Sequence, residues 1–136
     1  MSIDTIREFC MSLPHATERV QWGGVLVFKV AGKMFCIVIL EPDRDDTLMS
    51  FKATEEEFVE LQEIEGIIPA PYMARAKWLA LERWDALPMP ELKRLLRKSY
   101  ELVFAKLPKK EREKLERLRE GRGPSTRRAR GAPRSG

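Results

Sequence analysis

Basic and aromatic side chains stand close together in the stretch RAKWLALERWD, residues 75–85. Arginine and lysine bind nucleic-acid phosphates, and an aromatic ring beside them can stack on a base. Arg75, Lys77 and Trp78 are therefore candidate nucleic-acid contacts. The alternation of a β-strand offers a second interpretation, because it places Leu79 on one face and Trp78 on the other. In that interpretation Trp78 is structural and packs under the last helix of the domain.

Two further lysines flank a predicted β-turn. The runs VLVFKV and KMFCIVIL are separated by Ala31-Gly32, which indicates a two-residue hairpin because glycine adopts a positive φ without steric cost. Lys29 and Lys33 then lie near the hairpin tip, where lysines can contact phosphates. Alternatively, they serve solubility and keep a strand edge from pairing.

The same two-residue loop predicts a register for the hairpin, with Val30 opposite Lys33 and Phe28 opposite Phe35. Side chains on a strand alternate between the two faces of the sheet. One face is therefore expected to carry Leu26, Phe28, Phe35 and Ile37, and the other Val27, Lys29, Met34 and Cys36.

The charge is distributed unevenly along the chain. Residues 1–106 hold 14 Lys and Arg against 17 Asp and Glu, a net charge of −3, whereas residues 107–136 hold 11 against 4, a net charge of +7. The final stretch, RGPSTRRARGAPRSG, has no acid and no large apolar residue, so it cannot bury enough surface to fold. We predict a domain over 1–107, a charged, frayed helix over 108–120 and a disordered tail over 121–136. The tail residues Arg127, Arg128 and Arg130 are further candidate phosphate contacts.

The residues needed for catalysis or metal binding are scarce. His15 is the single histidine, and the sequence contains neither a nucleophile-elbow serine nor a glycine-rich phosphate motif. Cys10 and Cys36 stand at apolar positions without C-x-x-C spacing, which favours buried, reduced thiols over a disulfide or a metal clip. We therefore expect no enzymatic activity, no cofactor and no metal.

A helix at each end and strands between them are expected to position these residues. Apolar residues repeat with helical spacing from Ile3 to Leu13, TLMSFK and WLALE read as strands, and Thr54 with Glu57 forms a capping box. The prolines of IIPAPY are expected to forbid regular pairing. The last helix begins near Pro90. The expected core includes Phe28, Phe35, Ile37, Leu92, Leu96 and Val103.

This order of elements predicts an α+β domain, an antiparallel sheet with the terminal helices packed on one face. The longest apolar run, FCIVIL, is far too short to span a bilayer, and the first residues lack the pattern of a secretory signal. We therefore expect a monomeric, cytoplasmic protein that does not bind a membrane.

Several segments resemble the MmcQ/YjbR family of small bacterial proteins, in the same order and at similar spacings. They are SLPHATE, VLVFKVAGKMFCIV, SFKAT, IIPAPYMARAKWLALE and LPMPELKRLLRKSYELVFAKLPKK, and together they cover about residues 2–110. The resemblance implies a frataxin-like or secretion-chaperone-like fold and a DNA-binding function with two β-hairpin wings. Lys77 and Leu79 stand where many members have histidine and asparagine.

Two hypotheses about function follow. In the first, the protein binds nucleic acid, DNA in particular, weakly and with little sequence preference. In the second, it is a small adaptor without enzymatic activity that presents its sheet, or the groove beside IIPAPYMARAKW, to another protein. Iron binding, which the frataxin-like fold suggests, would need an acidic ridge along the first helix, and that helix offers only Asp4 and Glu8.

Overall fold

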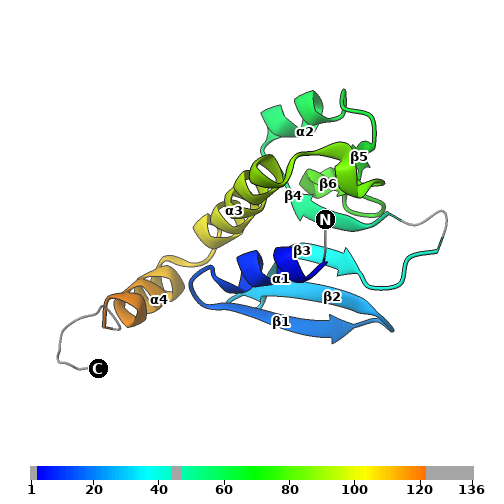
Figure 1. Ribbon diagram of the computed structural model, residues 1–136. Helices are drawn as coiled ribbons and strands as arrows, with labels where there is room; N and C mark the ends of the chain where they lie inside the picture. The colour runs from blue at the N-terminus through cyan, green and yellow to red at the C-terminus, as the bar shows by residue number, and fades with distance from the viewer. Residues whose placement is uncertain (1–2, 44–46, 122–136) are drawn as a thin grey trace. The chain divides into compact units, whose positions relative to one another are not determined.

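A six-stranded antiparallel sheet forms the framework of the protein, and α1, α2 and α3 pack on one of its faces (Figure 1). The computed structural model describes residues 3–43 and 47–121. From one edge to the other, the strands are β1 (Ala16–Gln21), β2 (Val25–Val30), β3 (Lys33–Ile39), β4 (Met49–Lys52), β6 (Trp78–Leu81) and β5 (Ile67–Pro69). The helices are α1 (Ile3–Met11), α2 (Glu55–Leu61), α3 (Met89–Ala105) and α4 (Lys109–Gly121), with 3-10 turns η1 (Ala74–Ala76) and η2 (Trp84–Ala86). The predicted α+β class is confirmed.

The chain divides into two compact units between Phe104 and Ala105. The first unit contains the sheet with α1, α2 and α3, and the second contains α4. Within the second unit, Arg112 Nε donates a hydrogen bond of 3.1 Å to the carbonyl oxygen of Leu107. The domain boundary at residue 107 and the fraying of the charged helix stay predictions. The candidate contacts Arg127, Arg128 and Arg130 lie outside the described residues.

The main hydrophobic core lies between the sheet and the three helices of the first unit. Ile6 and Cys10 of α1 enter it, and Phe58 of α2 packs against it while staying half-buried. The stripe that α3 buries consists of Leu92, Leu95, Leu96, Ser99, Tyr100 and Val103. All six side chains expected in the core are buried, namely Phe28, Phe35, Ile37, Leu92, Leu96 and Val103.

One extra residue in β3 changes the register of the β2–β3 hairpin. The tip pairs as predicted, but Phe28 pairs with Cys36 because a β-bulge leaves Phe35 opposite no residue of β2. Phe35 and Cys36 consequently both enter the core under the helices, whereas Ile37 lies on the other face of the sheet. The predicted pairing of Phe28 with Phe35 is therefore wrong, as are the predicted faces of Cys36 and Ile37.

Buried Ser99 of α3 joins this bulge to the neighbouring strand. Its hydroxyl donates to the Phe35 carbonyl oxygen at 2.6 Å and accepts from the Lys52 N–H at 2.9 Å. The β3–β4 ladder reaches only to the pair Cys36 and Phe51, so these two backbone groups lie just beyond it. A buried backbone group without a partner is costly. Ser99 thus completes the backbone hydrogen bonding where β3 and β4 diverge.

Two strands differ from the expectation. β1 covers ATERVQ, in which Thr17, Arg19 and Val20 are exposed and no simple apolar alternation marks a strand. β5 includes Pro69, so the expectation that the prolines forbid regular pairing is wrong. Because β5 is an edge strand that pairs only with β6, the missing N–H of proline does not interrupt a ladder on both sides.

The β2–β3 turn uses positive φ at both of its residues, 51° at Ala31 and 79° at Gly32. This is the backbone pattern of a type I′ hairpin turn, whose twist matches that of the flanking strands. Tyr72 and Lys77, both in the loop between β5 and β6, also have a φ of 65°. An L-residue other than glycine adopts this region at a steric cost, so surrounding contacts must hold it there.

Both cysteines are free and buried, as predicted. Burial raises the pKa of the Cys36 thiol well above its usual range, and a hydrogen bond with Cys10 adds to the effect. Such a thiol stays protonated and unreactive in the folded protein. Within the described part of the chain, no helix is both long and apolar enough to cross a membrane.

We expect Leu96→Ala to lower the free energy of unfolding by roughly 2–5 kcal/mol, because it removes a fully buried, packed side chain. Chemical denaturation followed by circular dichroism measures the change. Lys98→Ala, on the exposed face of the same helix, is the matched control and should shift stability by less than about 0.5 kcal/mol. Equal midpoints for the two variants would show that the buried face of α3 is assigned wrongly.

We expect Ser99→Ala to destabilise the protein by about 1–3 kcal/mol, because it leaves the Phe35 carbonyl and the Lys52 N–H without a partner. Hydrogen exchange of single amides locates the effect. The Lys52 amide should exchange faster in the variant than its lower global stability explains, whereas the Ile37 amide, inside the β3–β4 ladder, should follow the global change. Uniform acceleration of both amides would contradict the bridging role.

Candidate nucleic-acid interface

The strand register gathers most of the predicted contacts at one end of the sheet. Because neighbouring strands are antiparallel, the β2–β3 turn lies beside the end of β4, and β6 begins at that same end. Only β4 separates β3 from β6, so Cys36 and Leu79, which both pair with Phe51, are about 10 Å apart, two strand spacings, and the turn lies farther along toward the same end. We call this region the basic end of the sheet; it comprises Lys29, Lys33, Arg75 and Lys77.

Among the described residues, none of these four cations has a carboxylate partner, and Lys77 contacts the ring of Phe58 instead. Lys33 and Arg75 are exposed and Lys29 is half-buried. Within residues 3–43 and 47–121, none of the three forms an ion pair. Their charges are therefore available to an anion from outside the protein.

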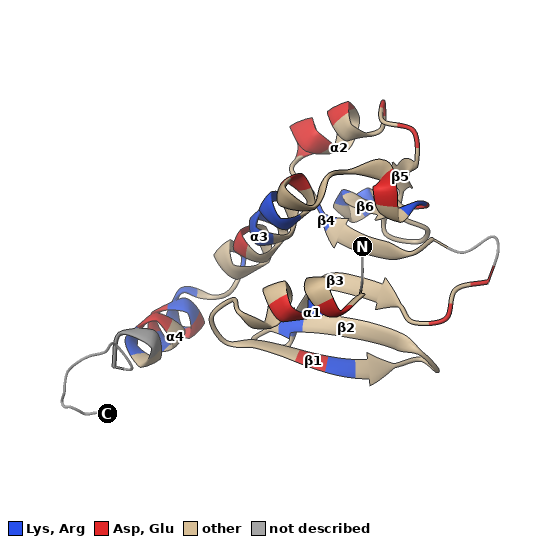
Figure 2. Cartoon of the chain, in the orientation of Figure 1, with Lys and Arg blue, Asp and Glu red and all other residues tan. Residues whose placement is uncertain are grey.

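Three arginines elsewhere in the first unit are paired with acids, whereas Arg19 and Arg97 form no ion pair among the described residues. Arg7 contacts Glu18 at 2.7 Å, and Arg83 contacts Asp85 at 3.0 Å. In each pair the hydrogen bond between the side chains raises the pKa of the guanidinium and lowers that of the carboxyl group. Arg94 likewise pairs with Glu91 on α3. Figure 2 shows basic residues on α3 in blue and, by contrast, acidic residues concentrated on α2 in red.

Lys52 and Lys77 hold the loop between β5 and β6 in place. Lys77 lies with its Nζ 5.1 Å from the ring centroid of Phe58, and its carbonyl oxygen accepts from the N–H of Ala53 at 2.9 Å. Lys52 Nζ donates to the carbonyl oxygen of Ala76 at 2.8 Å. Lys77 therefore lies on the helix side of the sheet and serves the loop as well as the charge of this end.

Lys29 lies on the face of the sheet opposite the helices. It pairs with Met34. On that face Met34 packs against a smaller apolar cluster, which consists of Ile37, Ala70, Trp78 and Ala80. The structure thus brings all four predicted cations to one end of the sheet but does not place Lys29 and Lys77 on the same face. Arg75, in the turn η1 just before Lys77, is exposed.

Trp78 is buried, with 6% of its surface exposed, and packs with Ile37 and Ala80. This cluster lies on the face of the sheet opposite α3, so the prediction that Trp78 packs under the last helix is wrong, although its structural role is clear. The exposed aromatic of this region is Tyr72, whose side chain is fully exposed. Its place in PAPYMAR, among prolines and before an arginine, was a signal that the sequence interpretation missed.

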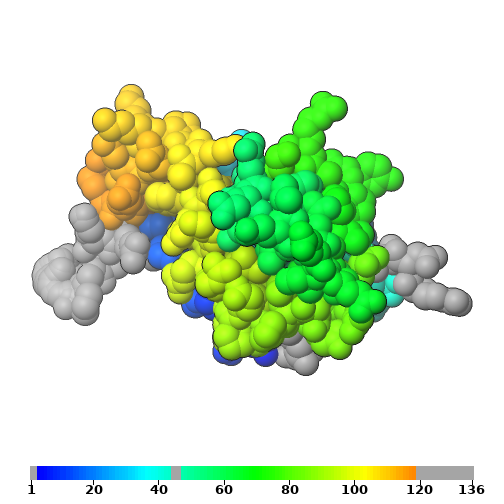
Figure 3. Space-filling model, turned by 90° about the horizontal axis from the view of Figure 1, so that it is seen from above, coloured from blue at the N-terminus to red at the C-terminus, as the bar shows by residue number. Residues whose placement is uncertain are grey.

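Figure 3 shows that the green segment, which includes α2 and the loop after β5, forms open surface of the first unit. Tyr72 and Arg75 both belong to this loop. An exposed ring and an unpaired guanidinium three residues apart can stack on a base and contact a phosphate. The loop and the β2–β3 turn are therefore the two elements of the candidate interface.

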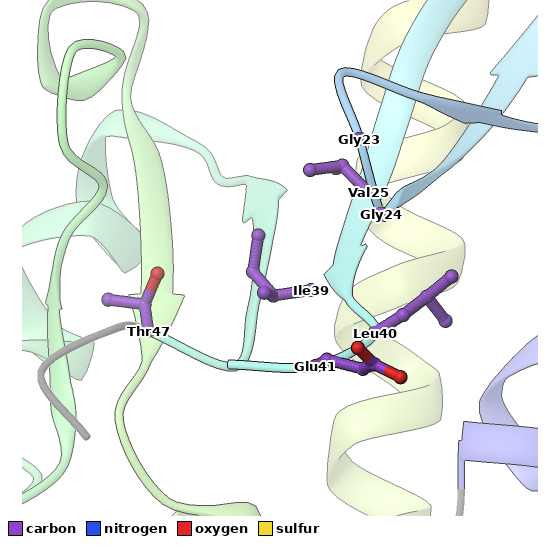
Figure 4. A pocket seen from close by; sticks show the side chains of 7 residues that line it. All are labelled: Gly23, Gly24, Val25, Ile39, Leu40, Glu41 and Thr47. Atoms are coloured by element: carbon purple, nitrogen blue, oxygen red, sulfur yellow. The ribbon is translucent and has the colours of Figure 1, made fainter. Parts of the chain in front are cut away.

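The opposite end of the sheet has different chemistry. A hollow of about 500 Å³ opens there, and Figure 4 shows Thr47 on one side of it and the turn residues Gly23 and Gly24 on the other. Glu41 is the one ionisable side chain among the described residues that line it. Because a carboxylate repels phosphate, this hollow is not part of the candidate interface. Its lining consists of Gly23, Gly24, Val25, Ile39, Leu40, Glu41 and Thr47.

No group of three histidine, cysteine, aspartate or glutamate side chains is arranged to hold a metal ion in the part of the chain that the structure describes. Cys10 and Cys36 are enclosed in the core.

Comparison with known proteins identifies relatives of this chain. Residues 11–102 match the family described as YjbR. A crystal structure of a Deinococcus radiodurans protein, DR2400, with a domain designated DUF419, is similar with a TM-score of 0.74 and 29% sequence identity; the alignment covers 85% of this chain and 88% of that protein. No curated protein matches the chain. The region matched to the family includes both elements of the candidate interface.

Proposed function

The chain belongs to the YjbR family, and from that premise we propose that it binds nucleic acid weakly and with little sequence preference through the basic end of its sheet. The observation that carries the proposal is a set of cations at one end of the sheet that have no carboxylate partner among the described residues, namely Lys29 and Lys33 of the β2–β3 hairpin and Arg75 of the β5–β6 loop. Phosphate contacts of this kind supply affinity without reading sequence.

Tyr72 adds a stacking surface beside Arg75. A base stacked on an aromatic ring contributes affinity for single strands with little preference among bases. The Arg-rich tail supports the proposal further, because Arg127, Arg128 and Arg130 belong to a segment with a net charge of +7 while residues 1–106 carry −3. In this proposal the domain supplies shape, and the tail raises the local concentration of the nucleic acid.

The proposal assigns no enzymatic activity, cofactor or metal to the protein, and it places a monomer in the cytoplasm. DNA is the first ligand to test, and RNA is an alternative with the same phosphate chemistry. The second candidate function is that of a small adaptor that binds another protein, which the absence of measurable nucleic-acid binding would favour.

We expect Lys29→Ala, Lys33→Ala and Arg75→Ala each to weaken binding of the full chain to a labelled DNA duplex at low salt, measured by fluorescence anisotropy. Three phosphate contacts correspond to a slope of about −3 in log K against log salt, and each alanine variant should reduce the slope by about 1. Arg83→Ala is the matched control, because that guanidinium is exposed but already paired with Asp85. For single strands, Tyr72→Ala should weaken binding more than Tyr72→Phe, which keeps the ring.

A variant with Arg127, Arg128 and Arg130 replaced by glutamine separates the tail from the domain. It should bind more weakly than the parent and still respond to Arg75→Ala. Complete loss of binding on changing the tail alone would assign the affinity to the tail. No binding by the full chain to DNA or RNA at low salt, where surface charge acts most strongly, would contradict the proposal.

We expect the purified protein to carry no stoichiometric iron or zinc, because no suitable ligand group exists among the described residues. Elemental analysis of protein isolated without chelators or affinity metals tests this. One equivalent of metal per chain would contradict the prediction and require ligands from the undescribed segments or from a second chain.

A further inference from the structure

β1 forms an open edge of the sheet. Among the described strands it pairs only with β2, and Figure 1 shows it at the border of the sheet. In an antiparallel strand, alternate residues direct their N–H and C=O groups away from the neighbouring strand. β5, at the other edge, is three residues long and contains Pro69, which lacks a donor. Only the β1 edge therefore offers a long, regular row of backbone groups to another chain.

A groove of about 380 Å³ accompanies this edge on the helix side of the sheet. Four apolar residues and four charged residues line it: Ile3, Val20, Leu26 and Leu40, and Asp4, Arg7, Glu18 and Arg19. Val20 is 58% exposed, unusually open for an apolar strand residue. Side chains of an added strand that point to the helix side would lie against Val20 and enter this groove.

The charges beside the edge define what such a strand should carry. Glu18 points to the helix side, where both of its carboxylate oxygens accept hydrogen bonds of 2.7 Å from Arg7. Arg19 points to the other face and forms no ion pair among the described residues. The complement of this edge therefore has apolar side chains on the helix side and acidic side chains opposite Arg19.

A second copy of this chain does not fit that description. Suppose that β1 pairs with β1 of a second copy, antiparallel and related by a two-fold axis, with the helices of both copies on the same side of the joined sheet. The two registers with the greatest overlap then place Glu18 opposite Glu18, or Arg19 opposite Arg19. Like charges directly opposite each other destabilise a strand pair. The edge is therefore suited to a strand from a different protein.

We propose that β1 binds an extended segment of another protein, in which apolar and acidic residues alternate, as an additional strand of the sheet. Main-chain hydrogen bonds supply the affinity, and the groove and Arg19 supply the specificity. The free edge of β1 adjoins the basic end of the sheet only where Thr17 pairs with Lys29, and the proposal rests on Arg19, Val20 and the groove, none of which the nucleic-acid proposal uses.

The test uses the full chain labelled with ¹⁵N and a blocked peptide of sequence VEVEVEV as the probe. We expect saturable chemical-shift changes in the amides of β1 and of Arg7, and no comparable changes at Lys33 or Arg75. A peptide of the same composition but without alternation, VVEEEVV, should bind more weakly. Two N-methylated forms of VEVEVEV serve as a further control, one methylated at the odd-numbered backbone nitrogens and the other at the even-numbered ones. Only one of the two should lose binding, because only one row of N–H groups faces β1.

Two variants test the side-chain contacts. Arg19→Glu should weaken VEVEVEV binding about two- to fivefold and favour VKVKVKV instead, because the charge at the edge is reversed. Val20→Lys should remove binding by placing a charge at the groove, whereas Val59→Lys, at a similarly exposed valine of α2, should not. The proposal would be overturned if the alternating and non-alternating peptides bound with equal affinity or if the chemical-shift changes lay away from β1. It would also be overturned if Arg19→Glu did not reverse the charge preference or if the chain associated with itself through β1.

Discussion

The hydroxyl group of Ser99 is the interaction on which the arrangement of the sheet and its last helix most depends. It satisfies two backbone groups at once, the carbonyl of Phe35 in β3 and the N–H of Lys52 in β4. The bulge at Phe35 turns that side chain into the core, where its ring meets Tyr100 edge-on at a centroid distance of 5.4 Å. One buried polar group thus fixes the position of α3 against the sheet and makes the irregularity of β3 compatible with a dry interior.

The same region connects the core to the candidate interface. Lys52, whose N–H bonds to Ser99, also uses its side chain to hold the loop that carries Tyr72 and Arg75. Regular alternation in β2 leaves Lys29 on the face opposite the helices, and the left-handed Lys77 lets the chain enter β6. The charges at this end of the sheet are therefore displayed by rigid backbone features, which reduces the entropy lost when a ligand binds.

Local sequence patterns predicted the parts of the fold that obey a simple period. The apolar stripe of α3, the capping box of Thr54 and the turn at Ala31-Gly32 all follow from side-chain spacing and turn chemistry, and the structure confirms each of them. Register beyond the turn was not predictable, because a bulge breaks the period of two and is stabilised by Ser99, 64 residues away in sequence. β1 was missed for a related reason, since an edge strand with exposed residues on both faces shows little apolar alternation.

The candidate site was predictable in its charges but not in its aromatic side chain. Lysines and arginines near turns are exposed in most folds, so the positions of Lys29, Lys33 and Arg75 followed from the sequence. Whether Trp78 or Tyr72 faces solvent depends on which segment covers the outer face of the sheet, and that is a tertiary property. Ala31 has a left-handed conformation, and glycine there would relieve roughly 1 kcal/mol of backbone strain while leaving the flanking Lys29 and Lys33 in place. A substitution of Ala31 by glycine could therefore raise the stability of the fold and compensate for destabilising substitutions that alter what the molecule binds.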